Sequence, residues 1–354
     1  MKSGKIKGML MAGMLTMSLC AGTAVMAAEA ETVPTVDGAA NITKNLHIAE
    51  GITVPDTTFT FKITQTEGDA TTVVSPVTAT FKGTDTVNAD LVSKTVATEL
   101  KDASKYPHAG VYTFTVSEEK GDVAGMTYDT KAYTVKVYVV NDGDGLKVDS
   151  ITANDEETKV SDMSFDNTYV KDSSFTIEKK VTGAQADRTK HFNFTINMTK
   201  ASTDTKTSYI GTIVKGDKCK ENHQNIVLKF DNTGKATANV KLCDGDKITF
   251  DNIAAGTRYT VTEAGAEDGY TPSVTVVENG AKAVQTNAAS DADEISADNK
   301  LIGENANSVV FTNAYADTPV TGVIINNLPY VVLVAAAVCA LAALVLINRR
   351  RQYR

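Results

Sequence analysis

Three kinds of polar residue recur in the same order in the two halves of the chain: a lysine, then a glutamate, then an asparagine. Each lies in a short segment whose apolar and polar residues alternate, which is typical of a β-strand. Residues i, i+2 and i+4 of a strand share one face, so each of these polar residues points the same way as its apolar neighbours. The two sets are Lys44, Glu118 and Asn167, and Lys179, Glu263 and Asn313.

The phase of the alternation selects which lysine and which glutamate belong to each set. One glutamate ends the run Tyr112-Thr-Phe-Thr-Val-Ser-Glu118, and the other ends Tyr259-Thr-Val-Thr-Glu263. Each asparagine closes a Phe-x-Asn segment. The adjacent Glu119 and Lys180 fall on the opposite face by the same rule, so they are weaker candidates.

A charged group in an apolar core costs free energy unless it is neutralised, paired or consumed by a reaction. Burial lowers the pKa of a lysine and raises the pKa of a glutamate, which favours a neutral amine beside a carboxylic acid. The acid could hydrogen-bond the asparagine side-chain oxygen, polarise its carbonyl group and shuttle protons as ammonia leaves. The expected products are the isopeptide bonds Lys44–Asn167, promoted by Glu118, and Lys179–Asn313, promoted by Glu263.

The alternative is that the lysines and glutamates lie on the surface and only the aromatic residues are buried. Two sets with the same order, similar spacing and the same strand phase favour the reactive interpretation. Residues 44 and 167 are 123 positions apart, and residues 179 and 313 are 134 positions apart. By analogy with disulfides, closing loops of this length would stabilise each domain by roughly 5 kcal/mol.

The elements that must position these residues are short alternating segments separated by turn signals such as Asn141-Asp-Gly-Asp-Gly145 and Asp231-Asn-Thr-Gly234. Such spacing predicts an all-β protein with two tandem immunoglobulin-like β-sandwich domains. Residues 88–100 have the one helical rhythm that we find, and residues 287–307 have the polar composition of a long surface loop. We expect an N-terminal domain over 28–171 and a C-terminal domain over 172–316.

The first 27 residues have the pattern of a secretory signal peptide. A basic start with three lysines precedes an apolar stretch, and Val25-Met-Ala27 offers small residues for cleavage. Secretion would place the remaining chain in an oxidising environment that permits disulfides.

Residues 317–354 combine three features: the motif Thr318-Pro319-Val320-Thr321-Gly322, the apolar run Val331–Ile347 and a tail with four arginines. The run is long enough to cross a bilayer, and the arginines favour a cytoplasmic end. An ordinary single-pass anchor is the alternative, but the order of the three parts resembles a cell-wall sorting signal read by a sortase. Thr318 stands where the usual motif has leucine, so this is a variant.

Removal of residues 1–27 and 322–354 would take away three lysines and four arginines and no acid, which changes the net charge from −8 to −15. An acidic ectodomain of this kind speaks against nucleic acid or anionic lipid as a partner. Cys219 and Cys243 remain in it, and the residues leave open whether they form a disulfide or stay as free thiols. We expect no metal and no cofactor, because no second cysteine or histidine lies at ligand spacing.

The leader, the repeated Tyr-x-[Phe/Val]-x-[Val]-x-Glu and Phe-x-Asn segments and the sorting signal together resemble a Gram-positive major (backbone) pilin of the two-domain streptococcal T-antigen type. The resemblance implies immunoglobulin-like domains with self-formed Lys–Asn bonds. It also implies a pilin-specific sortase that cuts between Thr321 and Gly322 and joins the thioester to a lysine of the next subunit. Lys159 stands where this type carries its acceptor lysine, while Lys147 and Lys171 remain alternatives.

The expected function is therefore a shaft subunit of a covalent pilus on a Gram-positive cell wall, with identical subunits, ancillary pilins and, through a housekeeping sortase, peptidoglycan as partners. A wall-anchored adhesin or ancillary pilin that binds a host or surface ligand without polymerising is the alternative. An enzyme is not expected, because the four histidines are scattered and no catalytic motif is present. Residues 141–145 lack the distant glutamate of a calcium loop and fit a hairpin turn better.

Overall fold

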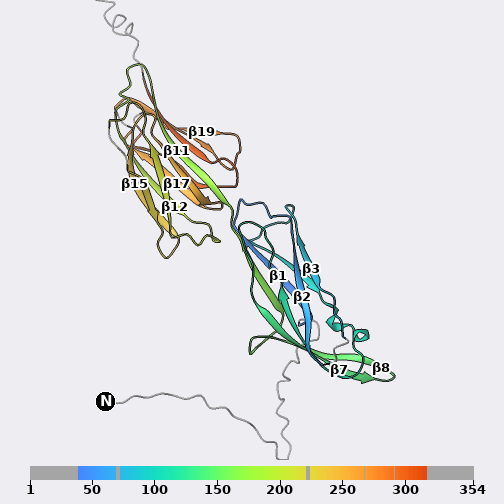
Figure 1. The fold of residues 1–354 in the computed structure, drawn as a ribbon. Coiled ribbons are helices and arrows are strands. Elements are labelled where there is room, and N and C mark those ends of the chain that lie inside the picture. Colours follow the sequence, from blue (N-terminus) through green and yellow to red (C-terminus); the bar gives the residue numbers. More distant parts are fainter. Residues whose placement is uncertain (1–38, 69–71, 221–223, 267, 291, 317–354) are drawn as a thin grey trace, which may run out of the picture. The chain divides into compact units, whose positions relative to one another are not determined.

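The computed structural model describes residues 39–316, except residues 69–71, 221–223, 267 and 291. In this part the chain forms β-strands and two short 3-10 helices (Figure 1). The strands build four sheets, two from residues 41–169 and two from residues 172–315. The predicted all-β fold with two sandwiches is confirmed.

The first sandwich pairs a four-stranded sheet with a six-stranded sheet. Its first and last strands are parallel neighbours in the smaller sheet, whereas the other strand pairs of this sandwich are antiparallel. The smaller sheet has the order β4 (Leu91–Ala97), β1 (Asn41–Ile48), β10 (Met163–Tyr169), β6 (Met126–Thr127). The larger has the order β3 (Val77–Phe81), β2 (Thr57–Glu67), β5 (Gly110–Glu118), β7 (Ala132–Asp142), β8 (Gly145–Asp155), β9 (Thr158–Val160), and the 3-10 helices are η1 (Glu99–Lys101) and η2 (Ala103–Lys105).

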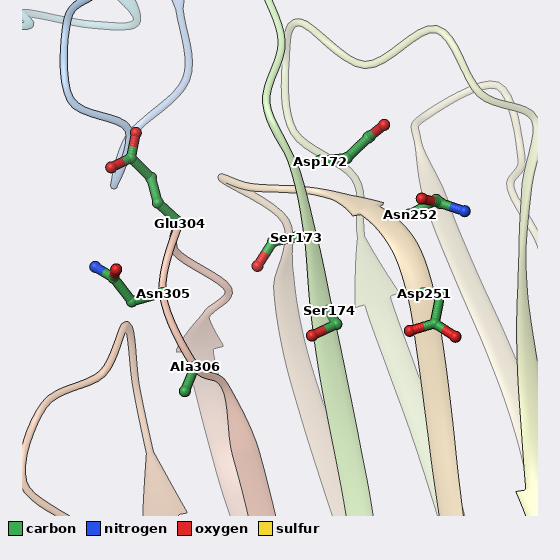
Figure 2. Close-up of a pocket in the computed structure, with 8 residues that line it drawn as sticks. All are labelled: Asp172, Ser173, Ser174, Asp251, Asn252, Glu304, Asn305 and Ala306. Atoms are coloured by element: carbon green, nitrogen blue, oxygen red, sulfur yellow. The ribbon is translucent and has the colours of Figure 1, made fainter.

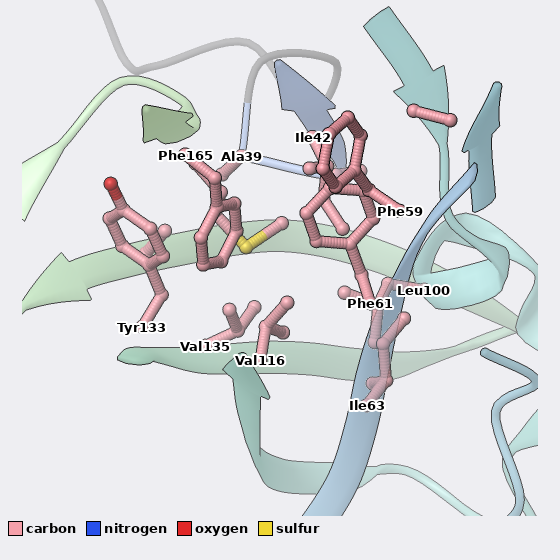
Figure 3. Packing of buried hydrophobic residues seen from close by; sticks show 14 of the residues in the cluster. Ala39, Ile42, Phe59, Phe61, Ile63, Leu100, Val116, Tyr133, Val135 and Phe165 are labelled. Atoms are coloured by element: carbon pink, nitrogen blue, oxygen red, sulfur yellow. The ribbon is translucent and has the colours of Figure 1, made fainter. Parts of the chain in front are cut away.

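Aromatic and branched side chains from the facing sides of these two sheets fill the space between them. Phe61 and Val116 of the larger sheet point toward Phe165 of β10 (Figure 3). The ring centroids of Phe61 and Phe165 are 5.0 Å apart, and Tyr133 meets Phe165 edge to face at 5.1 Å. The buried positions of β1 alternate along its whole length, as the period-2 pattern predicts.

The second sandwich pairs a seven-stranded sheet with a four-stranded sheet. Again the first strand and the last are parallel neighbours, here β11 and β21. The larger sheet has the order β14 (Ile226–Lys229), β13 (Ser208–Val214), β16 (Lys247–Ala254), β11 (Asp172–Thr182), β21 (Ser308–Tyr315), β18 (Tyr270–Val277), β19 (Val284–Asn287). The smaller has the order β15 (Lys235–Leu242), β12 (Phe192–Thr199), β17 (Arg258–Ala264), β20 (Glu294–Leu301).

The core of the second sandwich is also built from rings of both sheets. Phe194 of β12 meets Phe311 of β21 edge to face, with ring centroids 5.2 Å apart. The ring centroids of Phe175 of β11 and Tyr259 of β17 are 4.1 Å apart. Both sandwiches therefore bury the aromatic residues that the alternating pattern marked as inward-facing.

Two local predictions from the sequence are wrong. Residues 88–100 form no α-helix: β4 occupies most of the segment, pairs with β1 along its length and buries Val92, and only the last two residues lie in the 3-10 helix η1. Residues 287–307 are not one long loop, since β20 pairs with β17 and buries Ile295 and Ala297. In both cases sheet pairing overrides weak local signals.

The two predicted turns have different outcomes. The turn in Asn141–Gly145 joins β7 to β8 in a tight antiparallel hairpin, with Asp142 opposite Gly145. The turn in Asp231–Gly234 also forms, with the Gly234 N–H donating to the Asp231 carbonyl at 3.0 Å. However, the strands on its two sides belong to different sheets, so it joins the sheets and does not close a hairpin.

Strand β10 ends at Tyr169 and β11 begins at Asp172, so two residues separate the two sandwiches along the chain. The predicted signal peptide (1–27) and sorting signal (317–354) lie outside the described residues. Among the residues that the structure describes, no helix has the length and apolar character to cross a membrane.

Candidate functional site

The structure brings Lys44, Glu118 and Asn167 together in the core of the first sandwich. The parallel register of β1 and β10 places Asn167 opposite Leu46, so Lys44 and Asn167 are offset by two residues on neighbouring strands. Glu118 reaches them from β5 of the facing sheet. Its Oε2 lies 2.7 Å from Lys44 Nζ, and its Oε1 accepts a hydrogen bond of 2.6 Å from Asn167 Nδ2. The carboxylate thus bridges the amine and the amide.

Lys179, Glu263 and Asn313 repeat this arrangement in the second sandwich. Asn313 lies opposite Val181 in the parallel β11–β21 pair, which is the same two-residue offset. Glu263 comes from β17 of the facing sheet, and its Oε1 lies 2.8 Å from Lys179 Nζ and 2.6 Å from Asn313 Nδ2. The lysine and glutamate side chains of both sites have no solvent exposure, and neither do the asparagines.

Burial of these groups changes their proton affinity. Desolvation lowers the pKa of Lys179 to about 8 and also lowers the pKa of Lys44, although the carboxylate partner opposes the shift in each case. Desolvation raises the pKa of Glu263. Each amine also lies over an aromatic ring, Lys44 at 4.7 Å from the Phe59 centroid and Lys179 at 4.3 Å from that of Phe192. The core therefore increases the fraction of neutral amine, which is the nucleophilic form.

One detail differs from the sequence hypothesis. We expected the glutamate to hydrogen-bond the asparagine side-chain oxygen, but in both sites the asparagine nitrogen donates to the glutamate. A carboxylate that already accepts from an ammonium offers only acceptors, so the amide turns its N–H toward it. In this geometry the glutamate touches both the nitrogen that would attack and the nitrogen that would leave.

Comparison with known proteins gives the chain a family. A model described as a Spy0128-like isopeptide containing domain matches residues 40–170, and a model described as a domain of unknown function (DUF7601) matches residues 173–315. A pilin from Streptococcus pyogenes serotype M1 is 31% identical over 346 residues, which cover 94% of this chain and 96% of the relative. The chain belongs to the pilin family.

Solved structures of streptococcal pilins also match. The major pilin from Streptococcus pyogenes is 26% identical to this pilin, with a TM-score of 0.37, and the match covers 79% of this chain and 99% of that one. The T3.2 major pilin from the same species is 24% identical, with a TM-score of 0.35 and the same coverage of both chains.

The other lysines that the sequence named are on the surface of this pilin. Lys159 lies on β9, a three-residue edge strand that pairs with β8 alone. Its side chain is exposed, as are those of Lys147 and Lys171. Lys180 and Glu119 are exposed too, so the strand phase separated them correctly from the buried Lys179 and Glu118.

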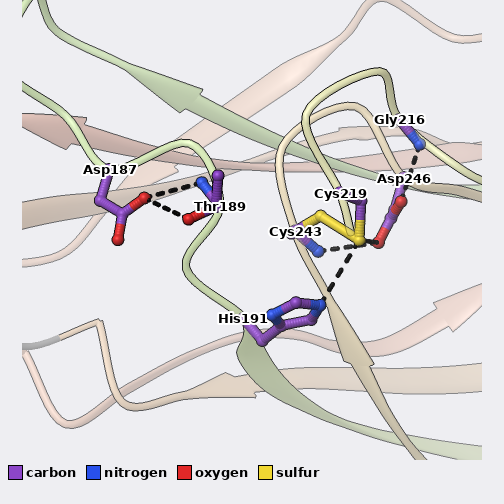
Figure 4. The surroundings of a disulfide bond; sticks show 7 residues. All are labelled: Asp187, Thr189, His191, Gly216, Cys219, Cys243 and Asp246. Atoms are coloured by element: carbon purple, nitrogen blue, oxygen red, sulfur yellow. Dashed lines mark hydrogen bonds between the residues drawn. A yellow bond between two sulfur atoms is a disulfide. The ribbon is translucent and has the colours of Figure 1, made fainter. Parts of the chain in front are cut away.

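The structure joins Cys219 and Cys243 by a disulfide, a pairing that the sequence left open (Figure 4). His191 Nε2 lies 3.4 Å from Cys219 Sγ, and the buried Asp246 accepts a hydrogen bond of 2.8 Å from the Cys243 N–H. His191 and the two cysteines bring three ligand-type atoms within 4.8 Å of one another, which spacing along the sequence did not indicate. Both sulfur atoms of this cluster belong to the disulfide.

Sequence reasoning missed Asp129, which lies between β6 and β7. Its backbone N–H donates a hydrogen bond of 2.7 Å to Asn167 Oδ1, and its side chain is nearly buried. Nothing in the sequence marks this residue, because it lies in a connecting segment 38 residues from Asn167.

The surface of the second sandwich has a shallow hollow of about 550 Å³ near the start of β11 (Figure 2). Asp172, Ser173, Asp251 and Glu304 are among the polar residues that line it. None of the residues that the sequence predicted as functional lines this hollow, so it is separate from the two buried sites.

Proposed function

We propose that this pilin is a shaft subunit of a covalently polymerised, sortase-assembled pilus on a Gram-positive cell wall, and that each of its sandwiches closes on itself by a Lys–Asn isopeptide bond. The observation that carries the proposal is the matched pair of buried sites, each linking the first strand of a sandwich to the last through a glutamate of the facing sheet. Membership of the pilin family supports the same assignment.

The proposed reaction consumes the buried charges that would otherwise destabilise the core. Within each buried ion pair, the lysine ammonium gives a proton to the glutamate, and the neutral Nζ attacks the asparagine Cγ. The glutamate then gives this proton to Nδ2 and takes the second proton from Nζ, and the Cγ–Nδ2 bond breaks to release ammonia and leave a neutral amide and a neutral carboxylic acid. Because each site reacts once with its own chain, the protein is not an enzyme in the sense of turning over a substrate.

The positions of the bonds suit a fibre under tension. Lys44 and Asn167 lie on the terminal strands of the first sandwich, and Lys179 and Asn313 lie on those of the second. A covalent link between terminal strands carries axial force past the strands in between. Each link would also stabilise its domain by roughly 5 kcal/mol through the unfolded state, as estimated for disulfides closing loops of this length.

The cross-links are tested by intact mass of the recombinant chain after reduction of its disulfide. Two bonds predict a mass below the calculated value by about 34 Da, the mass of two ammonia molecules. Glu118→Ala and Glu263→Ala should each restore about 17 Da, whereas Glu119→Ala, which changes an exposed residue of the same segment, should restore nothing. An unshifted mass of the unmutated chain would refute the proposal.

Polymerisation would begin at the sorting motif, where a pilin-specific sortase cleaves between Thr321 and Gly322. Its thioester would then pass to Lys159 of the next identical subunit, and a housekeeping sortase would join the finished fibre to peptidoglycan. The exposed edge strand β9 supports Lys159 as the acceptor, because an extended segment of the enzyme or of the incoming subunit can pair along such an edge. Ancillary pilins would attach to the same fibre.

Polymerisation is tested in a cell that expresses this chain with its sortase. The expected result is a ladder of high-molecular-weight products that survives boiling in detergent. Lys159→Ala should abolish the ladder, and Lys147→Ala, which removes an exposed lysine of the adjacent strand β8, should not. A single monomer-sized wall product from the unmutated chain would favour the alternative, a wall-anchored adhesin or ancillary pilin.

A further inference from the structure

The two cross-linking sites differ in what surrounds the asparagine oxygen. In the first site Asn167 Oδ1 accepts the 2.7 Å hydrogen bond from the Asp129 backbone N–H. In the second site Asn313 Oδ1 has no hydrogen-bond partner among the residues that the structure describes, although it is fully buried. The glutamate contacts also differ, because Glu118 uses separate oxygens for Lys44 and Asn167, whereas Glu263 uses Oε1 for both partners. In the described part of the chain, only the first site has a backbone donor at the asparagine oxygen.

The side chain of Asp129 holds this donor in place. Its Oδ2 accepts a hydrogen bond of 2.7 Å from the backbone N–H of Asp166, the residue before Asn167 on β10. Its Oδ1 accepts another of 2.9 Å from the Lys131 N–H, which closes a tight turn in the connecting segment. The carboxylate thus ties the turn to the strand that carries Asn167, and the turn directs its own N–H at the amide oxygen.

We propose that the Asp129 backbone N–H is an oxyanion donor for formation of the Lys44–Asn167 bond, and that the Asp129 carboxylate positions it. The inference deepens the proposed function and depends on it, because it concerns the rate of the same cross-linking step. The donor also selects the orientation of the amide, with oxygen toward Asp129 and nitrogen toward Glu118.

The donor acts where charge develops in the reaction. When Lys44 Nζ attacks Asn167 Cγ, the carbonyl electron pair moves onto Oδ1 and a tetrahedral oxyanion forms. The Asp129 N–H stabilises this negative charge in a site without solvent, where such a donor is most effective. The electron pair then returns, the Cγ–Nδ2 bond breaks, and ammonia leaves with the proton that Glu118 first took from the amine, while Glu118 takes the second proton from Nζ.

The test follows both bonds in the same molecule. The full chain is made by cell-free translation, samples are quenched in denaturant at intervals, and peptide mapping by mass spectrometry measures each bond. Asp129→Pro removes the N–H, and loss of one oxyanion donor predicts a Lys44–Asn167 rate lower by about 100-fold. Asp129→Ala keeps the N–H but loses the two side-chain hydrogen bonds that position it, so the Lys44–Asn167 rate should fall by about 10-fold. The rate in Asp129→Asn should lie between those of Asp129→Ala and the wild type. The Lys179–Asn313 rate should stay unchanged.

A charge effect predicts the opposite result. The negative charge of Asp129 raises the pKa of Lys44, against the larger effect of desolvation. If Asp129 acted only through this charge, its removal would leave more neutral amine and speed the reaction. A Lys44–Asn167 rate in Asp129→Ala that equals or exceeds that of the wild type would overturn the inference.

A purely structural role is separated by a second measurement. In a Glu118→Ala background, where no first-site bond is expected, Asp129→Ala should leave the thermal stability of the first sandwich within a few degrees of the parent. Equal slowing of both bonds, or a large loss of stability in this background, would overturn the inference and assign Asp129 to folding. Failure of the unmutated chain to form the Lys44–Asn167 bond at all would instead refute the proposed function.

Discussion

At the scale of the residue, burial turns ordinary side chains into a reactive set. Lys180 is exposed and pairs with Glu178 at 3.3 Å, whereas its neighbour Lys179 is fully buried and lies over the ring of Phe192. The same residue type thus has a solvent-stabilised charge at one position and a destabilised charge at the next. Desolvation outweighs the attraction of Glu263, which is why the pKa of Lys179 falls.

This shift predicts a pH-dependent stability when the bond cannot form. In Asn313→Ala, Lys179 keeps its amine, whose pKa is about 8 in the folded chain and 10.5 in the unfolded chain. Between pH 8 and pH 10.5 the unfolded chain binds more protons than the folded chain. The free energy of unfolding should therefore rise with pH over this range, by on the order of 3 kcal/mol. Urea denaturation at pH 7 and pH 10.5 measures the effect. Adding Lys179→Met should remove it, and an equal rise in that double variant would contradict the prediction.

At the scale of the element, the parallel pairing of first and last strands creates the sites. The same two-residue offset in β1–β10 and β11–β21 places a lysine beside an asparagine in both sandwiches. In the second sandwich, the turn after Cys243 forms backbone hydrogen bonds with β11 at Lys179. Lys179 N–H donates to the Asp246 carbonyl at 2.9 Å, and its own carbonyl accepts from Gly245 N–H at 2.8 Å. The disulfide therefore anchors the turn that holds the Lys179 backbone.

Removal of the disulfide should destabilise the second sandwich. Cys219 and Cys243 are 24 residues apart, and closing a loop of this size stabilises a protein by about 3 kcal/mol in the chain-entropy model. Urea denaturation of the Cys219→Ser/Cys243→Ser variant measures the loss. A reducing agent should lower the stability of the wild type toward that of the variant and leave the variant unchanged. Equal stability of the oxidised wild type and the variant would show that the disulfide contributes nothing.

At the scale of the whole molecule, two bonds at equivalent places would make each sandwich a closed covalent loop. Force applied at the chain ends would then pass from Lys44 to Asn167 and from Lys179 to Asn313 without unfolding the strands between them. A pilus subunit of this kind would resist extension through covalent bonds, and not through the hydrogen bonds of its sheets.

Single-molecule pulling tests this path of force. The wild type should show no unfolding step for the segment between Lys44 and Asn167. Glu118→Ala should release these 123 positions, which span about 40 nm when extended. Glu119→Ala is the matched control and should behave like the wild type. A 40-nm step in the wild type would contradict the predicted covalent path.

The sequence by itself determined the fold class and the membership of each reactive set, because period-2 alternation fixes which face of a strand a residue occupies. It separated Lys179 from Lys180 and Glu118 from Glu119 without any structure. It failed at residues 88–100 and 287–307, where the strands β4 and β20 exist because neighbouring strands offer partners. Local sequence has no information about such pairing.

Only the tertiary structure decided the contacts that depend on distant chain segments. The facing sheets bring Glu118 and Glu263 to their partners, and the connecting turn brings the Asp129 N–H to Asn167. The side to which the asparagine nitrogen turns, and the pairing of Cys219 with Cys243, also follow from three-dimensional neighbours. The alternation along a strand specifies the face to which a side chain points. The distances between side chains and their hydrogen-bond partners are set only when separate strands pack together.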